Sequence, residues 1–173
     1  MTCLAASSAT RIVGIADESQ LRTTLEEIDI QRRHPRANSG YLVAEQIRGD
    51  LELLVGFHRD DTFGATTVVG LGGIWAEALD VTALRVGVID PELALAMIDE
   101  RSVGRMLREA RGGSLAIDSV VEVICTISRI GHENPTVTSI EVNPLIVSRS
   151  GAVAVDGLIT TADFVVRSAY QMG

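Results

Sequence analysis

The segment from residue 139 to residue 156, SIEVNPLIVSRSGAVAVD, constrains the fold more than any other part of the chain. It holds two apolar stretches of strand-forming residues separated by the polar run 148–151, a pattern typical of a β-hairpin. Glu141 and Asn143 stand two apart on the first stretch, so they share one face of a strand. Asp156 ends the second stretch, and the hairpin brings it back beside them.

These three oxygen-bearing side chains predict a candidate cation site on an otherwise apolar face. Carboxylate and amide oxygens suit a hard cation such as Mg²⁺, held together with phosphate groups. An alternative stays open: an ordinary hairpin also exposes polar side chains, and an Asn-Pro pair often marks only a turn.

Periodicity along the rest of the chain alternates between strand and helix patterns. We expect a helix from Asp17 or Ser19 to about 33, because either residue is a good N-cap. Asp90-Pro91 should open another helix. The remaining expected strands lie at 11–15, 41–47, 51–58, 65–70, 74–79 and 82–88, and the remaining helices at about 103–110, 115–131 and 162–170. The fold class is therefore α+β, with an antiparallel sheet and helices packed on one side.

Composition narrows the classes of function. A chain of 173 residues fits a single domain, and its net charge of −8 argues against nucleic-acid binding. The two cysteines, Cys3 and Cys125, lie far apart and suggest no disulfide framework. No apolar run is long enough for export or for a membrane span. We expect a cytoplasmic protein with no membrane partner.

Three spaced motifs resemble one known family. Residues 40–59 read GYLVAEQIRGDLELLVGFHR, and residues 60–80 read DDTFGATTVVGLGGIWAEALD. Together with the 139–156 hairpin, they follow the order of the ATP-grasp domain of the ADP-forming acyl-CoA synthetases, a group that includes the acetate-CoA ligases. The beta subunit of succinyl-CoA synthetase is a more distant relative. The likeness runs from about residue 11 to about residue 160 and covers the C-terminal lobe of that domain.

The resemblance implies roles for the hairpin residues. Asn143 and Asp156 match the positions that bind Mg²⁺ with ATP or ADP. Glu141 matches the position where a phosphohistidine loop of a partner docks. It would hydrogen-bond the histidine ring there while phosphate passes between ATP and that histidine.

Four further residues are candidate contacts to the nucleotide or its phosphate, each with an open alternative. Glu45 would approach the adenine and ribose, or it is a solvated strand end. Gly72 and Gly73 would form a backbone nest for phosphate or for the partner's phosphohistidine loop, or they make a tight bend. Arg85 would contact a phosphate, or it forms a surface salt bridge.

The family's first ATP-grasp lobe has no match here. We expect residues 1–10 to be an N-terminal extension and 11–173 a single partial domain. All 15 basic residues are arginine, so no lysine can reach the phosphates, although a codon preference would give the same bias. One hypothesis is a split ligase, with a partner chain supplying the missing lobe and the CoA-binding subunit. The other is a non-catalytic binding or self-associating remnant. A homodimer would cover the faces that the missing lobe leaves bare.

Overall fold

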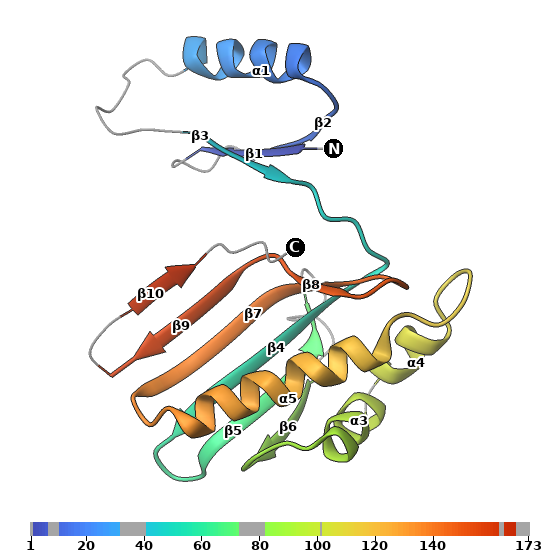
Figure 1. Cartoon of the computed structure of the whole chain (residues 1–173), viewed down its shortest axis with the longest axis vertical. Coiled ribbons are helices and arrows are strands. Elements are labelled where there is room, and N and C mark those ends of the chain that lie inside the picture. The colour runs from blue at the N-terminus through green and yellow to red at the C-terminus, as the bar shows by residue number, and fades with distance from the viewer. Residues whose placement is uncertain are drawn as a thin grey trace. The chain divides into compact units, whose positions relative to one another are not determined.

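The computed structural model describes residues 2–6, 11–31, 41–72, 82–100, 102–162 and 165–168. The chain forms two compact units, residues 1–47 and residues 48–173 (Figure 1). The expected strand at 74–79 and the residue Gly73 lie outside the described residues.

The N-terminal unit is a small antiparallel sheet with one helix. Its elements are β1 (Thr2–Ala6), β2 (Arg11–Ile15), α1 (Glu18–Gln31) and β3 (Tyr41–Glu45), and the strand order is β2-β1-β3. Asp17 caps α1 by accepting a 2.9 Å hydrogen bond from the amide of Gln20. Ile15 and Ile28 form its buried centre. Residues expected to be an extension therefore supply the central strand of this sheet.

The second unit is built on a larger antiparallel sheet. Its strand order is β10-β9-β7-β4-β5-β6, with β8 paired to β7 (Figure 1). The strands are β4 (Leu51–Asp60), β5 (Gly64–Leu71), β6 (Thr82–Val86), β7 (Val137–Val147), β8 (Ala152–Ala154), β9 (Gly157–Thr161) and β10 (Val165–Ser168). The helices are α3 (Pro91–Glu100), α4 (Ser102–Arg108) and α5 (Ile117–Glu133).

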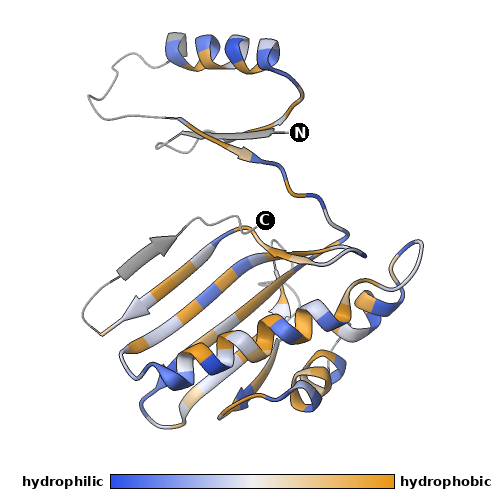
Figure 2. Cartoon of the chain, viewed as in Figure 1, coloured by the Kyte–Doolittle hydropathy of each residue, from blue (hydrophilic) through white to orange (hydrophobic). Residues whose placement is uncertain are grey.

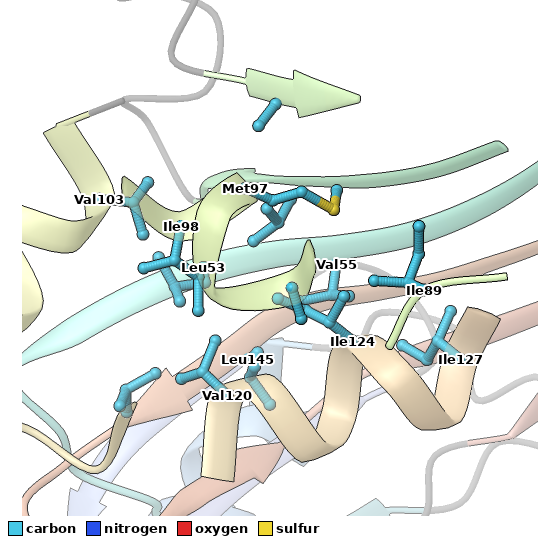
Figure 3. Packing of buried hydrophobic residues seen from close by; sticks show 14 of the residues in the cluster. Leu53, Val55, Ile89, Met97, Ile98, Val103, Val120, Ile124, Ile127 and Leu145 are labelled. Carbon is cyan, nitrogen blue, oxygen red and sulfur yellow. The ribbon is translucent and has the colours of Figure 1, made fainter. Parts of the chain in front are cut away.

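The core lies between one face of this sheet and the helices. Hydrophobic and hydrophilic positions alternate along β7 and around α5, as expected for elements buried on one side (Figure 2). Figure 3 shows Leu53 and Leu145 of the strands close to Val120 and Ile124 of α5, and all four side chains are fully buried. Arg59 fastens the end of α5 to the sheet, because its guanidinium donates to the carbonyl of Gly131 at 2.6 Å.

The expected α+β class with an antiparallel sheet and helices on one side is confirmed. Asp90 opens α3 as expected, since its carboxylate accepts the amide of Leu93 at 2.8 Å. The helix expected near 162–170 is wrong, because Val165–Ser168 forms strand β10 and pairs antiparallel with β9. Pairing with a neighbouring strand satisfies the backbone of this β-branched stretch, and local sequence does not reveal that partner.

Candidate functional site

The candidate site lies on the face of the larger sheet opposite its helices, which we call the helix-free face. Successive side chains of a strand point to opposite faces of the sheet. The buried positions of each strand face the helices, so the residues between them lie on the helix-free face. Cross-strand pairs then align its residues in rows: Gly56 of β4 lies opposite Val68 of β5 on one side and opposite Glu141 of β7 on the other. Leu84 and Leu158 continue this row on β6 and β9.

Strand β7 brings Glu141 and Asn143 together on this face. The side-chain amide of Asn143 donates to a carboxylate oxygen of Glu141 at 3.4 Å. The prediction that both residues share one strand face is therefore confirmed. The pairing of β7 with β4 shifts by one residue at this point. Val142 lies opposite Val55, but Leu145 lies opposite Leu53. Asn143 and Pro144 thus face a single residue of β4 as a β-bulge, which changes the direction of the side chains next to it.

Asp156 is held beside Asn143 through the backbone. It lies in the short link between the end of β8 and the start of β9, just past the return strand where we expected it. The amide of Asn143 donates to the carbonyl of Asp156 at 3.1 Å, and the amide of Val155 donates to the carbonyl of Pro144 at 3.1 Å. These two bonds hold the backbone of Asp156 beside Asn143, whose side chain contacts Glu141.

The chemistry of this group suits an oxygen-binding cation. Glu141 and Asp156 are exposed and Asn143 is partly buried, so the two carboxylates are open to solvent. Because the amide nitrogen of Asn143 is directed toward Glu141, its amide oxygen is left to act as a ligand. The described residues contain no group of three His, Cys, Asp or Glu side chains that could hold a metal. The donor set here needs the amide oxygen, and open positions would go to water and phosphate oxygens, as Mg²⁺ prefers.

Arg85 does not join this group. It pairs across the strands with Thr67, a fully buried residue of the helix-covered face, so it lies on the face opposite Glu141. Its guanidinium forms an ion pair with Glu100 of α3 at 2.5 Å. The geometry agrees with the salt-bridge alternative.

Gly72 serves the packing of the sheet. Its amide donates to the carbonyl of Glu52 at 2.9 Å, so this amide is already engaged. A Cβ atom at Gly72 would lie 2.9 Å from the backbone carbonyl of Leu53. The tight-bend alternative explains both facts. Glu45 ends β3 in the N-terminal unit and is exposed.

His58 also lies on this face, although from the sequence it is expected to be only a surface residue. It lies two positions beyond Gly56 on β4 and opposite Ser139 of β7. Strand alternation places Gly56 and His58 on one face, but only the strand register shows that this is the face of Glu141.

Comparison with known proteins decides the family. A model of the ATP-grasp domain matches residues 8–161. The chain belongs to the ATP-grasp family. The family expected from the three motifs is therefore confirmed.

Two relatives of this ATP-grasp chain are ADP-forming acetate–CoA ligases or subunits of them. It is 33% identical over 143 residues to the ADP-forming acetate–CoA ligase I of Archaeoglobus fulgidus, covering 80% of this chain and 21% of that protein. It is 29% identical over 148 residues to the beta subunit of the corresponding ligase of Pyrococcus furiosus, covering 83% of this chain and 64% of that subunit. The chain thus spans less than two thirds of each.

Solved structures confirm the fold. The acetyl-coenzyme A synthetase 1 of Ca. Korarchaeum cryptofilum, in complex with coenzyme A and Ca-AMPCP, matches with a TM-score of 0.79 at 26% identity, covering 93% of this chain and 76% of that one. The same protein with coenzyme A and Mg-AMPPCP matches with a TM-score of 0.74 at 28% identity, covering 87% and 67%. In that second structure a phosphohistidine segment points towards the nucleotide-binding site. No helix among the described residues is long and apolar enough to cross a membrane.

Proposed function

We propose that this chain is the nucleotide-binding lobe of an ADP-forming acyl-CoA ligase, acting in phosphoryl transfer between ATP and a histidine of a partner chain. The observation that supports this most is the contact between Asn143 and Glu141 on the helix-free face of an ATP-grasp lobe, with the backbone of Asp156 bonded to Asn143. The neighbours solved with nucleotide analogues add support, because their fold is the same.

In this proposal the three residues have two roles, metal binding and a hydrogen bond to the partner's histidine. Asn143 and Asp156 hold Mg²⁺ with the phosphates of ATP or ADP, and the ion supplies charge neutralisation on the phosphate oxygens. Glu141 accepts a hydrogen bond from the ring N–H of the partner's histidine. That bond fixes the tautomer, so that the other ring nitrogen faces the phosphate.

A partner chain follows from the same proposal. Relatives that this chain matches over 83% and 86% of its length are beta subunits, a name that implies another subunit. The partner would supply the CoA-binding subunit and the other ATP-grasp lobe, and the acid substrate would be chosen there.

The second candidate function is that of a non-catalytic module that binds partners or forms homodimers. The complete absence of lysine favours it, because no ammonium can reach the phosphates from this chain.

Isothermal titration calorimetry tests the proposal. Mg·ATP and Mg·ADP are titrated into the wild type, into Asn143→Ala/Asp156→Ala, and into Glu122→Ala as a control. Glu122 is an exposed carboxylate on α5, away from the site. We expect micromolar binding that weakens at least tenfold in the double variant and stays unchanged in the control. Equal binding in all three proteins would refute the assigned site, and no binding by a folded wild type would favour the non-catalytic module.

A further inference from the structure

A second row of polar side chains crosses the helix-free face beside Glu141. The strand register aligns Thr66 of β5, His58 of β4, Ser139 of β7 and Thr160 of β9 directly opposite one another. Side chains at such directly paired positions have Cβ atoms about 5 Å apart and share a face. His58, Ser139 and Thr160 therefore form a compact cluster of one imidazole and two hydroxyl groups.

Two members of this cluster have unused hydrogen-bonding capacity. Within the described residues, no hydrogen bond involves the imidazole of His58 or the hydroxyl of Ser139. His58 is exposed and Ser139 is partly buried. The hydroxyl of Thr66 is different, because it donates to the carbonyl of His58 at 2.8 Å and only supports the strand.

Charged residues of both signs share the helix-free face with His58. Of the basic residues nearby, Arg59 is directed to the carbonyls at the end of α5, and Arg85 lies on the helix-covered face. Of the carboxylates on this face, Asp60, two positions along β4, and Glu141, diagonally across on β7, lie nearest to His58. Asp60 is already engaged, because it accepts the amides of Thr62 and Phe63 at 2.8 Å each. Among the described residues, Arg167 of β10 also takes a position on this face, because it pairs with Leu158. The imidazole of His58 is a cationic donor when it is protonated, and the hydroxyls beside it are also donors.

We propose that His58, Ser139 and Thr160 form a subsite for a phosphate-type oxyanion. A protonated imidazole and hydroxyl groups donate hydrogen bonds to oxyanions, and the charge of the imidazole strengthens them. Along β7 the order is Ser139, Glu141, Asn143, so the subsite lies on the side of Glu141 away from the metal ligands. A histidine held at Glu141 would have Mg-nucleotide on one side and this subsite on the other.

The oxyanion has two possible sources: free inorganic phosphate, or the phosphoryl group carried by the partner's histidine. The second source rests on the proposed function. Binding of an oxyanion at His58 does not, because it needs neither nucleotide nor partner.

Proton NMR of the histidine rings tests the subsite, since the chain has only three histidines. His58 and His132 are assigned with His58→Gln and His132→Gln, and inorganic phosphate is titrated against a chloride control of equal ionic strength. We expect a saturable shift of His58 at low millimolar phosphate, no such shift of His132, and at least threefold weaker binding in Ser139→Ala. A His58 shift that does not saturate, that parallels His132, or that ignores Ser139→Ala would overturn the proposal.

A charge variant gives a second, independent readout. Glu141 lies diagonally from His58 across two paired strands, a Cα separation of about 7 Å. Removing a unit negative charge at that distance in water should strengthen anion binding by about threefold at low salt. Glu141→Gln should therefore bind inorganic phosphate about three times more tightly than the wild type. Unchanged or weaker binding would contradict the placement of the anion beside Glu141.

A comparison of two probes distinguishes the sources. If the partner's phosphoryl group is the ligand, phosphohistidine should bind at least threefold more tightly than inorganic phosphate, and Glu141→Gln should abolish that advantage. Equal affinities would identify free phosphate as the ligand.

Mg·ADP binding, measured in the same samples, separates the proposed oxyanion subsite from the proposed nucleotide-binding function. Phosphate binding with no nucleotide binding would refute the proposed function alone, and the reverse would refute the subsite alone.

Discussion

Gly131→Ala tests how helix α5 is seated against strand β4. A Cβ atom at Gly131 would lie 2.5 Å from three ring atoms of Phe57, whose side chain is buried. The ring has little freedom to move, because the guanidinium of Arg59 lies 5.5 Å from its centroid and is anchored to the carbonyl of Gly131. The added methyl group must therefore displace either the helix or the ring.

The expected magnitude follows from two opposing effects. Overpacking a core costs about 1–3 kcal/mol, and contacts this short belong at the upper end. Alanine in place of glycine inside a helix raises the free energy of unfolding by about 1 kcal/mol. The net loss in the free energy of unfolding is about 2 kcal/mol, which lowers Tm by about 8 °C in a domain of this size.

Urea and thermal denaturation, followed by circular dichroism, measure this loss. Gly104→Ala in α4 is the matched control, because its new methyl group would meet the exposed, movable side chains of Asp99 and Arg108 and only one backbone atom, the carbonyl oxygen of Ile98 at 3.1 Å. We expect the control to stay within about 1 kcal/mol of the wild type, because the same helix preference for alanine opposes the small cost of moving the exposed Asp99–Arg108 pair. Adding Phe57→Leu to Gly131→Ala should recover at least about 1 kcal/mol as coupling energy. A Gly131→Ala protein as stable as the wild type would refute the reasoning.

Three further variants probe single features. Thr67→Val should raise the free energy of unfolding by about 1 kcal/mol, because its buried hydroxyl finds no partner among the described residues, and urea denaturation showing a loss would contradict this. Gly72→Ala should lower Tm without any ligand present, because the methyl group would meet the backbone of Leu53, whereas an unchanged Tm would leave the phosphate nest as the better explanation. Asp60→Asn addresses pH: the amides of Phe63 and Thr62 lower the pKa of Asp60 below its ordinary 3.8. Its stabilisation is therefore complete above that value and disappears as pH falls through the lower folded-state pKa, so the Tm difference between wild type and variant should vanish at acidic pH.

The pairing of Glu141 with Asn143 could be predicted from sequence, because strand alternation is a local property. The position of Asp156 could be predicted only in part. Its backbone bond to Asn143 depends on where β8 ends and on the bulge at Asn143, and neither has a clear local signal.

Which face of β6 is buried against the helices could not be predicted from the composition of the strand. Leu84 and Val86 are more than half exposed, while the smaller Ala83 is buried against the helices. Hydrophobicity alone would bury the wrong side of this strand, and Arg85 shares the face of Ala83. Only the register with β5 places Arg85 away from the candidate site. Gly72 is similar, because the need for glycine comes from the backbone of a strand some twenty residues earlier.

Electron paramagnetic resonance of Mn²⁺ in the presence of ADP tests the central claim most directly, because Mn²⁺ replaces Mg²⁺ at oxygen ligands. The wild type should convert the spectrum of Mn·ADP into that of a protein-bound ternary complex. Asp156→Asn and Asn143→Ala should each return most of the signal to free Mn·ADP, while Glu122→Ala should behave as the wild type. A ternary complex that forms equally well in all four proteins would contradict the assignment of the metal to Asn143 and Asp156.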